Sequence, residues 1–145
     1  MRVVIDIDVL VAGLLLPFGP PAEIVRMIAS GSVSVCFDAR LITEYAQVLT
    51  RPKFPFGHED VRALLEQAKA GGVVVAGRPL PAALPDEDDA PFLQVALAGR
   101  ADCLITGNLR HFPASRRQGM LVLGPKAFLQ FYRQRMRKRK RPEIP

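Results

Sequence analysis

Short, mostly apolar runs constrain the fold of this 145-residue chain more than any other feature. The clearest runs are residues 2–5, 32–37 and 102–106, and weaker ones follow at 73–75 and 120–123. Strands with one solvated face alternate apolar and polar residues, whereas strands buried on both faces are apolar throughout, as in a parallel sheet. The runs therefore predict a central, mostly parallel sheet of about five strands.

The segments between these runs have helical periodicity. Apolar residues recur at helical spacing over 22–29, 39–50, 59–70 and 89–98, and a last helix is predicted to start at Pro125. Strands that alternate with helices of this length predict an α/β fold with right-handed crossovers. With 145 residues, 49% of them hydrophobic, we expect one domain that needs neither disulfides nor structural zinc.

Two carboxylates follow the first apolar run directly. Asp6 and Asp8 stand where the first strand is predicted to end, and ligands of open α/β sheets bind outside the carboxyl ends of the strands. The alternative is a helix N-cap, since Asp is favoured there and residues 9–16 have the pattern of a helix. One Asp is enough for a cap, so the pair favours a functional role for Asp6.

Two further acids lie near the predicted inner faces of helices. Glu44 comes three residues after Leu41 and four before Val48, which places its carboxylate toward the core unless it lies at the edge and reaches water. Asp89 lies one turn before Phe92, although acids at a helix start also complement the helix dipole. An unpaired buried carboxylate is unstable, so both positions call for a nearby cation.

These side chains are predicted to converge at one edge of the sheet, where Thr106 and Asn108 also follow a strand. Carboxylates that lie close together raise one another's pKa unless a cation lies between them. An all-oxygen ligand set of Asp6, Glu44 and Asp89 selects Mg²⁺ or Mn²⁺ over zinc. Such an ion activates water and stabilises charge on a phosphoryl group, which predicts hydrolysis of phosphodiester bonds.

The order of these segments resembles that of a known family. The matching stretches fall between about residues 2 and 132, and they are 5–15, 17–22, 44–54, 86–93, 101–108, 111–112 and 124–129. As a set they resemble PIN-domain proteins, the VapC-like ribonucleases that are toxin components of bacterial toxin–antitoxin systems.

The resemblance implies a three-layer α/β/α PIN-like fold over residues 1–132 and a metal-dependent ribonuclease that uses Mg²⁺ or Mn²⁺. Matched motif to motif, Asp6, Glu44 and Asp89 are the metal ligands and, together with Asn108, the catalytic residues. The resemblance also implies RNA as substrate, a homodimer, and a cognate antitoxin protein as partner.

Two positions depart from the family pattern. The first motif, usually Asp-Thr-Asn, ends here in Asp8, and Asn108 or His111 stands where a fourth acid is common. We expect Asp8 and Thr106 to lie beside the metal ligands, and His111 to be a surface or capping histidine. The departures also fit the main alternative, a degenerate PIN domain that binds RNA or a partner protein without cleavage.

A phosphatase is the second alternative. Asp6 and Asp8 after an apolar strand also resemble the nucleophile motif of haloacid-dehalogenase-like phosphatases, and 104–108 imitates their second motif. Those enzymes require a Lys and an acidic pair later in the chain. Here the acidic cluster 86–89 comes before Thr106, so the order argues against this function.

The formal net charge of +6 belongs to the end of the chain. Residues 133–145 hold seven basic residues and one acidic residue, whereas residues 1–132 hold thirteen of each. We expect a flexible basic tail, with RNA-binding residues Arg137, Lys138, Arg139, Lys140 and Arg141. Residues 51–56 also mix bases with aromatic rings, as proteins that bind single strands do, although a loop packed on the core is the commoner structure.

Cysteines and hydropathy carry little functional signal. Cys36 and Cys103 lie in apolar runs without the spacing of a metal site, which predicts small buried side chains. No apolar stretch has the length of a membrane span or the pattern of a signal peptide, so we expect a cytoplasmic protein.

Overall fold

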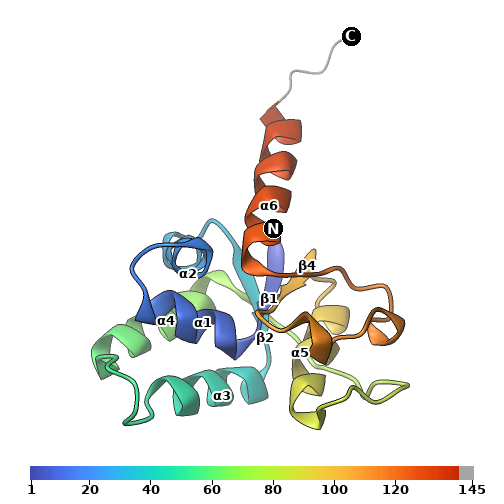
Figure 1. Ribbon diagram of the computed structural model, residues 1–145, viewed down its shortest axis with the longest axis horizontal. Coiled ribbons are helices and arrows are strands. Elements are labelled where there is room, and N and C mark those ends of the chain that lie inside the picture. The colour runs from blue at the N-terminus through green and yellow to red at the C-terminus, as the bar shows by residue number, and fades with distance from the viewer. Residues whose placement is uncertain (141–145) are drawn as a thin grey trace.

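The computed structural model describes residues 1–140 and contains one sheet of five parallel strands in the order β3-β2-β1-β4-β5 (Figure 1). The strands are β1 (Arg2–Ile5), β2 (Ser34–Phe37), β3 (Val73–Val74), β4 (Cys103–Ile105) and β5 (Val122–Leu123). Each predicted apolar run forms one strand, so the prediction of a parallel sheet is confirmed. The shortest strands, β3 and β5, form the two edges, where each has only one neighbour.

Six α-helices connect or follow the strands in the described part of the chain. They are α1 (Ile7–Leu15), α2 (Pro20–Ser30), α3 (Ala39–Leu49), α4 (His58–Gly71), α5 (Ala90–Ala98) and α6 (Pro125–Lys140), with 3-10 turns η1 (Glu87–Asp89), η2 (Leu109–His111) and η3 (Ala114–Arg116). Helix α2 begins two residues before its predicted start, because Pro20 and Pro21 occupy the first helical positions, where a missing N–H is harmless.

The helices cover both faces of the sheet. Helix α5 packs on β1, β2 and β4, helix α4 packs on β2, and helix α2 contacts α4 and α6. Figure 1 shows α1, α2 and α4 on one side of the strands and α5 on the other. The predicted three-layer α/β/α architecture is therefore confirmed.

The strand order creates a switch point beside β1. The chain passes from β1 to β2 on one side of it, whereas β4, on its other side, is followed by β5. Crevices at such points, outside the carboxyl ends of the strands, are the usual ligand sites of open α/β sheets. Asp6 directly follows β1, and Thr106 directly follows β4, so both lie at this crevice.

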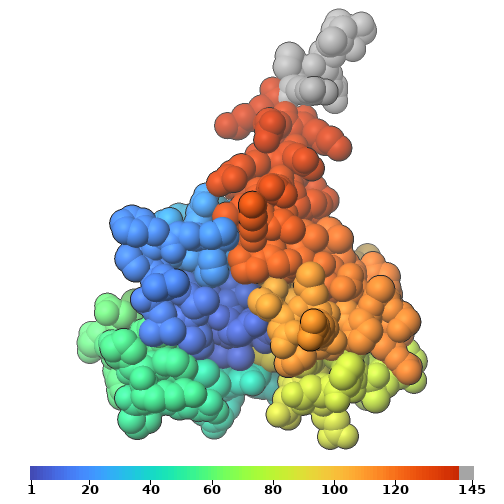
Figure 2. Space-filling model, viewed as in Figure 1, coloured from blue at the N-terminus to red at the C-terminus, as the bar shows by residue number. Residues whose placement is uncertain are grey.

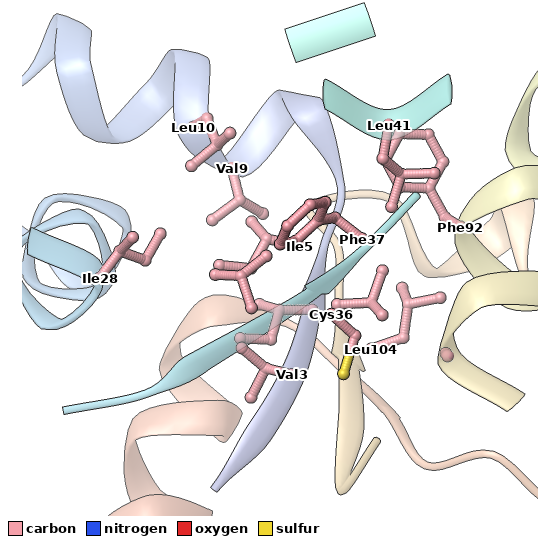
Figure 3. Packing of buried hydrophobic residues seen from close by; sticks show 14 of the residues in the cluster. Val3, Ile5, Val9, Leu10, Ile28, Cys36, Phe37, Leu41, Phe92 and Leu104 are labelled. Atoms are coloured by element: carbon pink, nitrogen blue, oxygen red, sulfur yellow. The ribbon is translucent and has the colours of Figure 1, made fainter. Parts of the chain in front are cut away.

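The core fills the space between the layers with aliphatic and aromatic side chains. Figure 3 shows Val3 and Ile5 of β1 packed among residues of the neighbouring strands and helices, including Phe92 of α5. Cys36 and Cys103 are fully buried, as predicted. Burial raises the pKa of the Cys103 thiol to about 12, so this sulfur is a packing group and not a nucleophile.

Helix α6 differs most from the sequence prediction. The predicted boundary between residues 132 and 133 falls inside this helix, and 133–140 continue it as a column that projects from the body of the molecule (Figure 2). Arg133 forms an ion pair with Glu23 of α2 at 3.2 Å, and Arg135 forms one with Asp102 at 2.8 Å. The basic segment is thus helical up to residue 140, and the two ion pairs anchor its beginning. Residues 141–145 lie outside the described part of the chain.

Within residues 1–140, no single helix is long and apolar enough to cross a membrane. Helices α1 and α2 reach the required length and hydropathy only as a pair bent by 101°, and both contribute buried residues to the core.

Candidate active site

Asp6 lies at the junction of β1 and α1, where its carboxylate is 5% exposed. Its backbone N–H continues the sheet by donating to the Ile105 carbonyl at 2.9 Å, while its side chain makes no capping hydrogen bond to α1. Instead, the Thr106 hydroxyl donates to Asp6 Oδ2 at 2.8 Å. Asp6 therefore stands at the N-cap position without acting as a side-chain cap, and its carboxylate is free for another function.

The environment of Asp6 disfavours its charge. Burial and, to a smaller extent, the nearby charges of Asp8 and Asp89 together raise the pKa of Asp6 from 3.8 to about 7, against the opposing hydrogen bond from Thr106. A carboxylic acid that titrates near neutrality in a crevice is a sign of a functional site.

Asp8 is fixed by the loop after β4. The Gly107 N–H donates to Asp8 Oδ2 at 3.0 Å and is also 3.3 Å from Oδ1. A Cβ atom at Gly107 would lie 2.7 Å from Asp8 Oδ2, so a larger residue there would displace the carboxylate from this position. Asp8 is thus a bridge between α1 and the loop that carries Asn108, and it lies close enough to Asp6 to affect its pKa.

Asp89 is the last residue of the 3-10 turn η1 and occupies the N-cap position of α5. Its side chain makes no capping hydrogen bond. Burial raises its pKa, and His111 opposes this shift. Asp89 Oδ2 lies 2.9 Å from His111 Nδ1, but within residues 1–140 this buried oxygen has no partner with hydrogen-bond geometry. Such an oxygen is an available ligand atom.

His111 connects Asp89 with Asn108. Its Nε2 lies 2.8 Å from Nδ2 of Asn108 and accepts from this amide when the ring is protonated at Nδ1, the nitrogen that lies 2.9 Å from Asp89 Oδ2. The backbone N–H of Asn108 donates in turn to the Thr106 hydroxyl at 3.0 Å. His111 is thus a surface histidine, as expected, with a side chain 40% exposed, and it also contacts Asn108 and Asp89. The three-residue spacing from Asn108 across η2 is the sequence signal that places both side chains together.

Glu44 stands half-buried on α3, beside the same crevice. Burial raises its pKa, as do the charges of Asp88 and Asp89, while Arg51 lowers it. The neighbouring Tyr45 donates its hydroxyl to the Ile5 carbonyl, which ties α3 to the end of β1. Glu44 also lines a hollow of about 600 Å³ between α3 and η1. The half-buried side chain of Glu44 is therefore neither fully core-facing nor fully solvated, the two alternatives that periodicity left open.

The carboxylates of Asp6, Glu44 and Asp89 are the ligand type that a hard divalent cation prefers. In this structure, however, they do not lie close enough together to enclose one. The pKa values of Asp6, Glu44 and Asp89 are all raised, each by the charge of at least one other acid, and Asp89 has an orphan oxygen. In the described part of the chain, no three Asp, Glu, His or Cys side chains are grouped tightly enough to hold a metal ion. The ligand set therefore requires side-chain movement to close around an ion.

The basic residues predicted to bind RNA lie away from this edge. Arg137, Lys138, Arg139 and Lys140 are exposed at the end of α6, and Arg141 lies outside the described residues. The ion pair of Arg135 with Asp102 places α6 at the amino ends of the strands, since Asp102 precedes β4 and accepts from the N–H of Arg2. The basic end of α6 thus lies at the amino ends of the strands, whereas the carboxylates lie at the carboxyl ends (Figure 1).

Comparison with known proteins gives one match. A family model described as PIN domain covers residues 2–110, a range that includes Asp6, Glu44, Asp89 and Asn108. Neither curated proteins nor solved structures give a significant match.

Proposed function

The chain belongs to the PIN domain family, and from this premise we propose that it is a metal-dependent endoribonuclease that hydrolyses RNA phosphodiester bonds. PIN domains are generally nucleases, often dependent on a divalent metal. RNA as the substrate and Mg²⁺ or Mn²⁺ as the ion are the specific parts of the proposal. Because the chain belongs to the PIN domain family, we no longer consider the haloacid-dehalogenase-like phosphatase alternative.

The buried carboxylate of Asp6 is the single observation that supports this function best. It lies at the switch point of the sheet, makes no structural cap, and has a pKa raised to about 7 by burial and by neighbouring acids. A cation at this position would offset the repulsion between Asp6 and Asp89 and explain why the fold retains both charges.

The proposed roles follow from the contacts. Asp6, Glu44 and Asp89 would hold Mg²⁺ or Mn²⁺, whose chemistry is to activate water and to neutralise charge on the phosphate. Thr106 holds Oδ2 of Asp6 by a hydrogen bond and so would orient the carboxylate for the ion. Asn108 can donate to a phosphate oxygen if His111 releases its amide, and that is its proposed catalytic role.

The resemblance of the motifs supports a biological setting for this activity. We propose a toxin of a toxin–antitoxin pair, acting in the cytoplasm as a homodimer and held inactive by a cognate antitoxin protein. The exposed basic residues 137–140 would add non-specific attraction for RNA at the far edge of the domain.

A degenerate PIN domain that binds RNA or a partner protein without cleavage is the second candidate. Two observations favour it: Asn108 stands where a fourth acid is common, and the acids within residues 1–140 are not grouped around a common ion position. Under this alternative, RNA binding is the same in Mn²⁺ and in EDTA, and no cleavage occurs.

The deciding experiment incubates a mixed RNA pool with the protein, with and without Mn²⁺. We expect Mn²⁺-dependent cleavage by the wild type and none by Asp6→Asn or Asp89→Asn. The matched control is Asp60→Asn, which removes an exposed carboxylate from α4 and leaves cleavage unchanged. Full activity in either site variant removes that residue from the site, and equal activity in EDTA refutes metal dependence.

A further inference from the structure

The candidate site lacks an obvious way to hold its substrate. Asp6, Glu44 and Asp89 repel an RNA backbone until a cation is bound, and the exposed bases 137–140 lie at the opposite edge of the sheet. A strand that reaches the carboxylates therefore needs cationic and stacking contacts on the same side of the domain. The hollow beside Glu44 leads to a segment with both kinds of side chain.

That segment is residues 51–56, which directly follow α3 and continue from the hollow. Arg51 lines the hollow together with Glu44, and its charge lowers the pKa of Glu44. The N–H of Arg51 donates to the Val48 carbonyl at 3.2 Å, and the N–H of Phe54 donates to the Arg51 carbonyl at 3.0 Å. These turns place Phe54 next to the end of α3, and Arg51 connects the segment to the hollow that Glu44 lines.

The aromatic rings of this segment are already stacked. The rings of Phe54 and Phe56 lie 5.2 Å apart between centroids with an angle of 13° between their planes, and the Lys53 ammonium is 5.1 Å from the centroid of Phe54. Phe56 packs against the hydrophobic core, so one ring of the stack is held by the body of the domain. Lys53 is exposed, so it can move aside from the ring toward a phosphate.

Two prolines keep the segment rigid. Pro52 and Pro55 flank Lys53 and Phe54, and each fixes its own φ angle. A surface that is ordered before binding loses little conformational entropy when a ligand arrives, which raises affinity. The arrangement therefore has the properties of a preformed binding surface as well as those of a loop packed on the core.

We propose that residues 51–56 form a platform for an unpaired nucleotide of the substrate, with a base stacked on Phe54 and phosphates held by Arg51 and Lys53. The inference rests on the proposed ribonuclease function and specifies single-stranded RNA as its substrate class. Stacking requires a base with a free face, which paired bases inside a duplex do not offer. Alternating cations and rings fit a nucleic acid strand better than an apolar protein surface, because every base offers a face for stacking and every linkage a charge.

The test measures RNA binding separately from cleavage. The full chain is titrated in EDTA with a fluorescent single-stranded RNA of mixed sequence and with the duplex of the same sequence, and affinity is followed by anisotropy. Phe54→Leu should bind the single strand roughly tenfold more weakly than the wild type, whereas Phe54→Trp should bind it at least as tightly. The matched control is Phe18→Leu, since Phe18 is the most exposed of the large hydrophobic residues, at 83%, and lies outside the segment.

The outcomes separate this inference from the proposed function. Unchanged single-strand affinity in Phe54→Leu, or an equal loss in Phe18→Leu, overturns the platform, and so does an equal loss for the duplex. If the platform alone is wrong, Mn²⁺-dependent cleavage by the wild type persists. If the ribonuclease function is wrong, cleavage is absent for every variant. Phe54→Trp keeps the test valid if the leucine variant folds poorly, because weaker binding by a folded tryptophan variant also refutes stacking.

Discussion

Replacement of Asp6 by Asn is expected to stabilise the metal-free protein while it abolishes activity. The pKa of Asp6 rises from 3.8 to about 7 on folding, mainly through burial and the charge of Asp8. Each pKa unit corresponds to about 1.4 kcal/mol, so the ionised carboxylate destabilises the fold by about 4 kcal/mol. Asn removes the charge, and its side-chain oxygen still accepts the hydroxyl of Thr106.

The sign of the effect depends on pH in a defined way. Below the unfolded value of 3.8, Asp6 is protonated in both states and the charge has no effect on stability. As pH rises from there to about 7, the unfolded chain releases the proton while the folded chain keeps it, so the wild type loses stability relative to Asp6→Asn. Above about 7 both states are ionised, and the full difference of about 4 kcal/mol remains.

Urea unfolding in EDTA across this pH range measures the difference directly. We expect the free energies of unfolding of wild type and Asp6→Asn to coincide near the acidic end and to separate toward neutral pH. Saturating Mn²⁺ should stabilise the wild type and leave the variant unchanged, since only the native carboxylate completes the ligand set. The control Asp60→Asn should show neither effect. A variant less stable than the wild type at alkaline pH, or a difference that does not change with pH, refutes the argument.

Three further predictions concern other parts of the molecule. Gly13→Ala should lower the free energy of unfolding by roughly 1–3 kcal/mol in thermal melts, because its Cβ would lie 2.5 Å from the Pro21 carbonyl oxygen. His111→Ala should weaken Mn²⁺ binding about tenfold by calorimetry, whereas His111→Asn, whose amide can replace Nδ1 against Asp89, should retain most of it; equal losses contradict the orienting contact. Replacement of the basic residues 137–140 by Gln should reduce the salt dependence of RNA affinity but not the cleavage rate at saturating RNA, and a slower rate would place α6 at the site.

The fold was predictable because its signals are local and agree with one another. Every strand lies in a mostly apolar run, and Gly31 ends α2 in a left-handed conformation at φ 78°. The helical state of residues 133–140 was not predictable from composition, since consecutive basic residues repel one another and lack an apolar stripe. The structure adds two long-range partners, Glu23 for Arg133 and Asp102 for Arg135, that no local pattern indicates.

The site was predictable where a residue's position in an element decides its role. Asp6 and Thr106 follow adjacent strands, and parallel strands bring their carboxyl ends together, so their contact follows from topology. His111 lies in an irregular segment, and its contact with Asp89 depends on how η2 approaches the start of α5. The same holds for Asp8, whose bond to Gly107 depends on the absence of a single Cβ atom.

The energetic cost of the carboxylates argues for a working site. Burial and the charges of neighbouring acids raise the pKa values of Asp6, Glu44 and Asp89, so each ionised carboxylate destabilises the free protein. A domain that only presented a surface to RNA or to a protein would lose nothing by carrying amides at these positions, and its stability would increase. A bound cation would offset the destabilising effect of all three ionised carboxylates at once. The distribution of charge therefore supports the proposed cation site. The stabilities of wild type and Asp6→Asn in EDTA and in Mn²⁺ measure the cost of the free carboxylate and the gain from the ion.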